Sequence, residues 1–148
     1  MTEKDAARPL TRITTSATFS SAHRLHNPAR DEEWNRAVFG KCNNPYGHGH
    51  DYLLEVGVRG PVEERSGRVA EVAALDRLVG GEVIRAFDHR DLNQDVPEFA
   101  SVVPTTENLA LEVERRLRRN WSAAFPGEWP RLDRIRIRET KRNIFEIS

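Results

Sequence analysis

The chain has 148 residues with 23 basic and 23 acidic side chains, so its formal net charge is zero at pH 7. That length predicts a single domain over residues 1–148, and the balanced charge argues against a nucleic-acid or acidic-membrane surface and favours a small-molecule partner. One cysteine excludes an intramolecular disulfide, and no apolar run is long enough for a signal peptide or a membrane span, so we expect a cytoplasmic protein. Residues 1–10, polar and broken by Pro9, are predicted to be a loose leader.

The first predicted element is a strand over residues 11–23, whose odd positions form its less polar face. Residues 24–47 follow as a long irregular stretch, which we interpret as functional because Trp34 and Phe39 give it something to pack with. A second strand is predicted over residues 48–59 and carries its apolar side chains at even positions.

Two helices are predicted next. Apolar residues that recur at i, i+3 and i+4 predict an amphipathic helix over residues 71–87, although Gly80-Gly81 weakens it. A second helix is predicted over residues 106–121, with Thr105 or Thr106 as its N-cap.

Two short strands, over residues 132–139 and 143–147, complete the chain. The element order ββααββ predicts an α+β fold in which a four-stranded antiparallel sheet is backed by two helices. Glu139 shares the parity of Ile135 and Ile137 and so falls on the apolar face, where a carboxylate is costly unless it is paired. It either reaches water or Lys141, or it accepts N–H groups from a bound heterocycle.

Three histidines are candidates for a metal site. His48 and His50 are spaced i, i+2 at the start of the second predicted strand, so both project from one side. His23 ends the first predicted strand on its less polar face. A lone histidine on an apolar face is more often a hydrogen-bonded core residue than a ligand, but this set of three favours zinc at the rim of a sheet.

Two further features carry ionisable groups. Cys42 lies six residues before His48 and is either a fourth ligand of a closed structural zinc site or a group outside the coordination sphere. Asp88-His89 follows the first predicted helix, where the pair is either a helix-end cap or an acid–base pair in which the aspartate orients the imidazole.

Seven sequence blocks in a fixed order resemble the 6-pyruvoyl-tetrahydropterin synthase family, and the likeness runs from about residue 12 to residue 147. The blocks are Phe19-Ser20-Ser21-Ala22-His23, Phe39-Gly40-Lys41-Cys42-Asn43-Asn44-Pro45, Gly47-His48-Gly49-His50, Asp88-His89-Arg90-Asp91-Leu92-Asn93, Asp95-Val96-Pro97, Pro104-Thr105-Thr106-Glu107-Asn108, and Glu139-Thr140 before Asn143-Ile144. The five residues between Cys42 and His48 resemble the pyruvoyl-forming branch, since the carboxy-forming relatives generally have a shorter spacing.

The resemblance implies a fold, an assembly and a site. The fold is the tunnelling fold, in which subunits join into a trimeric β-barrel that is doubled to a homohexamer with active sites at subunit interfaces. It implies Zn²⁺ held by His23, His48 and His50, with Cys42 as a base and not a ligand. It further implies a proton relay and a pterin pocket, whose residues are Asp88 and His89 for the relay and Glu139, Thr105, Thr106 and Glu107 for the pocket.

The implied activity is that of a lyase of tetrahydrobiopterin biosynthesis. It converts 7,8-dihydroneopterin triphosphate into 6-pyruvoyl-tetrahydropterin with elimination of triphosphate and needs no nicotinamide or flavin. The alternative is 6-carboxy-5,6,7,8-tetrahydropterin synthase of queuosine biosynthesis, a carbon–carbon lyase that releases acetaldehyde and triphosphate. A third interpretation, a non-catalytic binding module stabilised by zinc, requires the closed metal site with Cys42 as fourth ligand.

Overall fold

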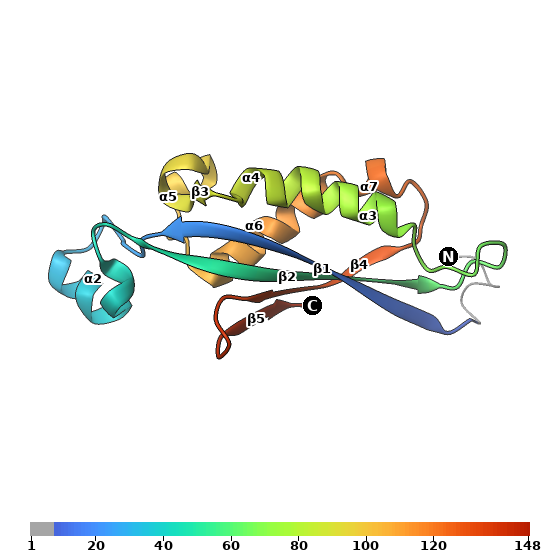
Figure 1. Cartoon of the computed structure of the whole chain (residues 1–148), viewed down its shortest axis with the longest axis horizontal. Helices are drawn as coiled ribbons and strands as arrows, with labels where there is room; N and C mark the ends of the chain where they lie inside the picture. Colours follow the sequence, from blue (N-terminus) through green and yellow to red (C-terminus); the bar gives the residue numbers. More distant parts are fainter. Residues whose placement is uncertain (1–7) are drawn as a thin grey trace.

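The computed structural model describes residues 8–148 (Figure 1). Its strands are β1 (Leu10–His23), β2 (His48–Pro61), β3 (Arg90–Asp91), β4 (Arg131–Arg138) and β5 (Ile144–Ile147). Its helices are α2 (Glu32–Phe39), α3 (Val72–Val79), α4 (Arg85–Phe87), α5 (Leu92–Asp95), α6 (Thr106–Arg119) and α7 (Trp121–Ala124), with 3-10 turns η1 (Gly40–Asn43) and η3 (Pro97–Ala100) and a π-helical turn η2 (Gly80–Ile84). Most of the predicted leader lies outside the described residues, and β1 begins at Leu10.

The strands form one sheet in the order β3-β1-β2-β4-β5. Its main ladder is the antiparallel pair β1 and β2, which runs from Leu10 opposite Pro61 to His23 opposite His48. The four predicted strands are confirmed, but the count of four is wrong because β3 adds a short parallel pairing with β1. Two residues are too few to show alternation in a sequence, and β3 forms because His89 has a left-handed φ of 58° and donates its backbone N–H to Ser20 O at 2.7 Å.

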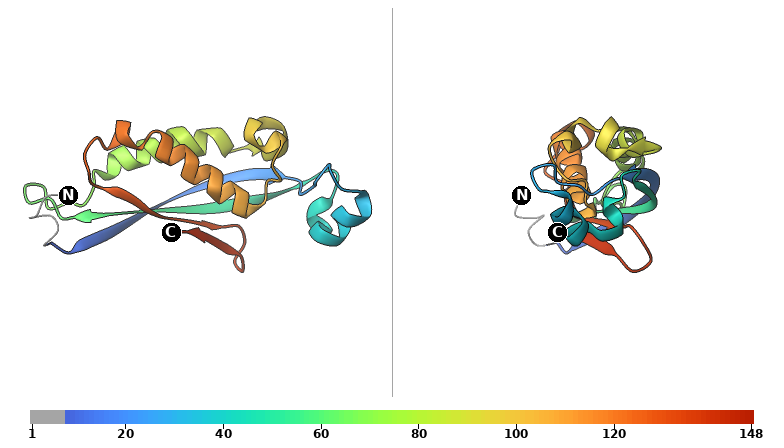
Figure 2. Two further views of the ribbon diagram at one scale, coloured as in Figure 1. Left: turned by 180° about the vertical axis from the view of Figure 1, so that it is seen from behind. Right: turned by 90° about the vertical axis from the view of Figure 1, so that its left-hand side faces the viewer.

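The helices α3, α4 and α6 lie on one face of the sheet (Figures 1 and 2). The even residues Leu54, Val56 and Val58 of β2 point into the core with at most 1% of their surface exposed. The apolar stripe of α6 meets them and is equally buried, as the 3.6-residue period predicts; its members are Leu109, Val113 and Leu117. No helix among residues 8–148 is both long and apolar enough to cross a membrane.

The first predicted helix is confirmed as one run from Val72 to Phe87, in which Gly80 and Gly81 open the π-helical turn η2 between α3 and α4. The second is confirmed with Thr105 as N-cap, because its side chain accepts the backbone N–H of Asn108. Its predicted end is two residues too late, since α6 stops at Arg119 and the separate turn α7 follows.

The prediction that residues 24–47 are irregular is wrong in part. The segment contains α2 and η1, which lie beyond the end of the sheet where β1 finishes and β2 begins (Figure 1). Asp31 is the N-cap of α2 and accepts the backbone N–H of Trp34 at 2.7 Å. Trp34 and Phe39, which were expected to give this stretch something to pack with, contact each other, with their rings 5.9 Å apart and nearly perpendicular.

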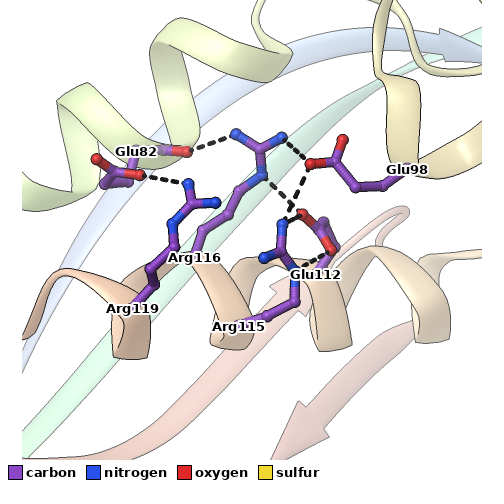
Figure 3. A network of polar contacts seen from close by, with 6 residues as sticks. All are labelled: Glu82, Glu98, Glu112, Arg115, Arg116 and Arg119. Carbon is purple, nitrogen blue, oxygen red and sulfur yellow. Dashed lines mark hydrogen bonds and ion pairs between the residues drawn. The ribbon is translucent and has the colours of Figure 1, made fainter.

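A network of ion pairs fastens α6 to the turns η2 and η3 (Figure 3). Glu112, 9% exposed, accepts hydrogen bonds from Arg115 and Arg116 on its own helix. Both arginines also reach Glu98 Oε1 in η3 at 3.1 Å. The network therefore fixes the position of η3 (Pro97–Ala100) against α6.

Candidate functional site

The three predicted histidines converge at one end of the sheet. His23 ends β1 directly opposite His48, and His50 follows two residues later on the same face of β2. His23 Nε2 and His48 Nε2 lie 3.2 Å apart. One ligand nitrogen from each of the three rings lies within 4.8 Å of the others, so this cluster can hold a metal ion.

His23 is oriented by a carbonyl that the sequence did not reveal. Its ring is 1% exposed, and Nδ1 lies 2.8 Å from Pro104 O. A carbonyl only accepts, so Nδ1 carries the proton and donates it, and the lone pair of Nε2 faces the cluster. Such a bond to the distal ring nitrogen is the usual support of a metal-binding histidine.

The donor set fits a metal such as zinc. Burial lowers the pKa of His23 and His48 from its ordinary value, and the neighbouring imidazoles lower it further, so both rings are neutral and free to coordinate at pH 7. The buried nitrogen His50 Nε2 makes no hydrogen bond within residues 8–148, which leaves its lone pair or proton unsatisfied there. Cys42 is not part of this three-residue cluster.

Glu139 borders the cluster. It lies one residue past the end of β4 and not within a strand, and its backbone N–H donates to Asn143 O at 3.1 Å in the turn to β5. Its Oε1 is 3.2 Å from His50 Nε2 and 3.9 Å from His23 Nε2, while the side chain is 14% exposed. The carboxylate therefore turns inward to the histidines and not to Lys141, although it lies too poorly aligned on His50 to form a hydrogen bond.

Cys42 belongs to η1 and is half-buried. The backbone of this turn is tied to the end of β1, because Leu25 N–H donates to Cys42 O at 2.8 Å. Burial raises the pKa of the Cys42 thiol, and the negative charge of Glu139 raises it further. The polypeptide alone thus keeps Cys42 protonated, so any thiolate has to be stabilised by positive charge brought to the site.

Asp88 and His89 form a pair on the edge of the sheet. Asp88 Oδ1 accepts the backbone N–H of Ser20 at 2.9 Å, and Asp88 Oδ2 lies 3.0 Å from His89 Nδ1. The backbone hydrogen bond from Ser20 and the contact with His89 lower the pKa of Asp88. The His89 side chain is 83% exposed, and within the described chain the side chains of the pair contact each other and the backbone of Ser20 and not Cys42.

The residues at the start of α6 have different environments. The Thr105 hydroxyl is used as a helix cap, and Glu107 is exposed. Thr106 is 3% exposed, and within the described part of the chain its hydroxyl makes no hydrogen bond of full geometry. Our sequence analysis missed Tyr52 as a site residue, although its even parity matched that of His50, whose ring centroid lies 5.7 Å away.

The Tyr52 hydroxyl is buried, and burial and the charge of Glu139 raise the pKa of Tyr52. Thr106 is near enough to lower that pKa slightly, although the two hydroxyls lack full hydrogen-bond geometry. The two buried hydroxyls thus lie near each other on the Tyr52 side of the histidine cluster, and among residues 8–148 neither makes a hydrogen bond of full geometry.

Comparison with known proteins identifies an enzyme family. A family model described as 6-pyruvoyl tetrahydropterin synthase matches residues 12–148, and the chain belongs to that family. A 6-pyruvoyl tetrahydrobiopterin synthase from Poecilia reticulata is 43% identical over 132 residues, which are 89% of this chain and 86% of that protein. The human protein of the same name is 35% identical over 143 residues, covering 97% of this chain and 94% of its own.

A solved structure supports the same assignment. The Caenorhabditis elegans 6-pyruvoyl tetrahydropterin synthase superposes with a TM-score of 0.85 at 36% sequence identity, covering 95% of this chain and 96% of that chain. The α+β fold expected for a single chain of the family is thereby confirmed.

Proposed function

We propose that this protein is a zinc-dependent lyase that converts 7,8-dihydroneopterin triphosphate into 6-pyruvoyl-tetrahydropterin and triphosphate. The observation that carries the proposal is the cluster of three inward-facing imidazoles, with ligand atoms within 4.8 Å, in a chain 35% to 43% identical to named synthases. The three histidines would supply the three protein ligands that are typical of catalytic zinc sites, in contrast to the four of structural sites.

The metal ligands in this proposal are His23, His48 and His50. Zinc, when bound, polarises the side-chain hydroxyls of the substrate as a Lewis acid and makes the adjacent protons easier to remove. Cys42 is the base that accepts a proton, because it is the one thiol of the chain and is tied by its backbone to the end of β1. The substrate loses triphosphate while hydrogens move within it, so the reaction is redox-neutral.

Glu139 and the start of α6 are the proposed pterin contacts. The inward carboxylate of Glu139 can accept two N–H groups from the edge of the pterin ring. The Thr106 hydroxyl is buried and unpartnered and can bond to the ring as well. Thr105 and Glu107, at the start of the same helix, complete the proposed pocket.

The relay residues Asp88 and His89 act on Cys42 across a subunit interface in this proposal. His89 is strongly exposed on the edge of the sheet and is already held by Asp88, so a neighbouring chain can receive it. The outer edge of β1, most of which is unpaired within residues 8–148, also supports an oligomer. Asp88, His89 and β3 occupy its outer edge from Ser20 to Ala22, which leaves the part of that edge before Ser20 free to pair with a strand of a second copy. We propose a trimeric barrel doubled to a homohexamer, with residues 1–148 as its single-domain subunit.

Product analysis tests the proposed reaction. Zinc-loaded protein is incubated with 7,8-dihydroneopterin triphosphate, and the pterin products are identified by mass, with Cys42→Ala as a control. We expect 6-pyruvoyl-tetrahydropterin and triphosphate from the wild type alone. A 6-carboxy product with acetaldehyde would instead establish the carbon–carbon lyase, and the absence of any turnover by zinc-loaded oligomer would contradict both enzymes.

A further inference from the structure

The carbonyl of Pro104 reaches His23 across 81 residues of sequence, and a short turn aims it. We propose that Asn108 is a positioning residue of the metal site, because it holds this turn and thereby sets the tautomer of His23. The inference rests on the proposed zinc site and adds a residue that contacts neither metal nor substrate.

The turn works through the geometry of one peptide group. Thr105 N–H donates to Val103 O at 2.9 Å. In a trans peptide the C=O and N–H bonds point in opposite directions, so a bond that turns Thr105 N–H towards Val103 turns Pro104 C=O away from it. The direction away from Val103 is the direction of His23 Nδ1, 2.8 Å from Pro104 O.

Asn108 fixes the acceptor on which that turn depends. Its Nδ2 donates to Val103 O at 2.8 Å, so this carbonyl receives two N–H groups and uses both of its lone pairs. The amide nitrogen has to face Val103, because an amide oxygen there would meet another acceptor. Without Asn108, the Val103 carbonyl keeps only the bond to Thr105, which closes a three-residue inverse γ-turn centred on Pro104.

The helix below Asn108 is well anchored. The backbone N–H of Asn108 donates to Thr105 Oγ1 at 3.2 Å, and the next residue, Leu109, is fully buried in the core. Asn108 therefore transmits the position of α6 to the turn and does not follow the turn passively.

The chemical consequence concerns which nitrogen of His23 is free. With Pro104 O in place, the proton resides on Nδ1 and the lone pair on Nε2 faces His48 Nε2 at 3.2 Å. If the carbonyl turns away, the proton is free to move to Nε2, where it blocks coordination. Losing such a supporting bond typically weakens metal binding by about 10–100-fold.

Two measurements on Asn108→Ala test the proposal. Zinc affinity is measured by competition with a chromophoric chelator, and the His23 tautomer is read from ¹⁵N chemical shifts of the metal-free protein. We expect zinc affinity about 10–100-fold weaker than wild type, together with a new population of His23 protonated on Nε2. The matched control is Asn120→Ala at the opposite end of α6, which should change neither value.

The contrary results are equally specific. Zinc affinity within twofold of wild type, or an unchanged His23 tautomer, overturns the role of Asn108. If Asn108→Ala does not fold, Asn108→Asp decides, because it keeps the shape while facing the Val103 carbonyl with an acceptor and should show the same loss. Failure of wild-type protein to bind zinc contradicts the proposed function, whereas zinc binding that ignores Asn108 contradicts this inference alone.

Discussion

Glu139 Oε1 lies 3.2 Å from His50 Nε2, so the carboxylate predicted to hold the pterin ring is also a neighbour of the histidine cluster. The same charge raises the pKa of the Cys42 thiol and of Tyr52. The charge of Glu139 therefore acts on three parts of the site at once: the histidine cluster, the proposed base Cys42, and Tyr52.

Replacing Glu139 by Gln tests both of its proposed effects. The amide keeps the shape but exchanges one acceptor for a donor, so pterin affinity should fall by about 2 kcal/mol, the cost of spoiling a charged hydrogen bond. The substitution also removes a negative charge, so the pKa of Cys42 should fall and its alkylation near pH 8 should become faster. Calorimetric titration and the pH profile of alkylation measure the two effects. Wild-type pterin affinity in a folded, zinc-loaded variant would remove the anchor.

The metal site is tested by His48→Ala. We expect wild type to contain about one zinc per chain and the variant to contain almost none, because two imidazoles rarely retain zinc. Metal content is measured by atomic spectroscopy on protein passed over a desalting column. His26→Ala is the control, since His26 lies outside the cluster and bonds to Asn43. Full zinc content in the triple alanine variant of His23, His48 and His50 would reject the site.

The role of the thiol is tested by Cys42→Ala. The variant should keep its zinc and lose most turnover, because the thiol is proposed as base and lies outside the histidine cluster. Zinc content and single-turnover rate are measured on one preparation. If zinc is lost together with the thiol, Cys42 is a ligand and the closed structural site is the better interpretation.

The relay is tested by His89→Asn. Within one chain His89 faces solvent beside Asp88, so its effect on Cys42 should exist only in the assembled oligomer. His89→Asn removes the imidazole that is proposed to favour the Cys42 thiolate. It should therefore raise the pKa of Cys42 and shift its alkylation profile to higher pH, with zinc content unchanged. An alkylation profile that coincides with that of the wild-type oligomer argues against the relay.

The ion-pair network of α6 predicts that the free energy of unfolding depends on pH. Burial acts to raise the pKa of Glu112, but the hydrogen bonds from Arg115 and Arg116 outweigh it and leave the pKa below its ordinary value. The folded pKa is therefore below the unfolded one, so this contribution is present above about pH 4.3 and disappears as the pH falls through the lowered value.

Denaturation of Glu112→Gln against pH measures that contribution. At pH 7 the variant should be less stable by roughly 2 kcal/mol, the scale of a hydrogen bond to a charged group, and its deficit should shrink in acid. Glu114→Gln on the same helix is the control, because among residues 8–148 Glu114 pairs only with the exposed Arg118 and its loss should cost less than about 1 kcal/mol. Equal deficits for the two variants at pH 7 would contradict the role of Glu112.

Strand parity was sufficient to predict the histidine cluster, because the side-chain period of a strand is a property of the local chain. It placed His23, His48 and His50 on one face, and the register of β1 and β2 confirms this. The Pro104 carbonyl could not be predicted in this way, since its contact with His23 depends on how α6 is docked. The helix α2 was predictable in principle from Asp31 followed by two glutamates, but its eight residues carry too few apolar positions for a clear period.

The pairing of His23 with His48 at the last rung of the β1–β2 ladder also bears on folding. A slip of this hairpin by one residue would turn the side chains of one strand to the opposite face and separate the imidazoles. The three histidines can therefore coordinate one ion only when β1 and β2 are paired in the native register. A bound ion would therefore stabilise β1 and β2 only when they are paired in the native register, and strands paired in a shifted register would separate again.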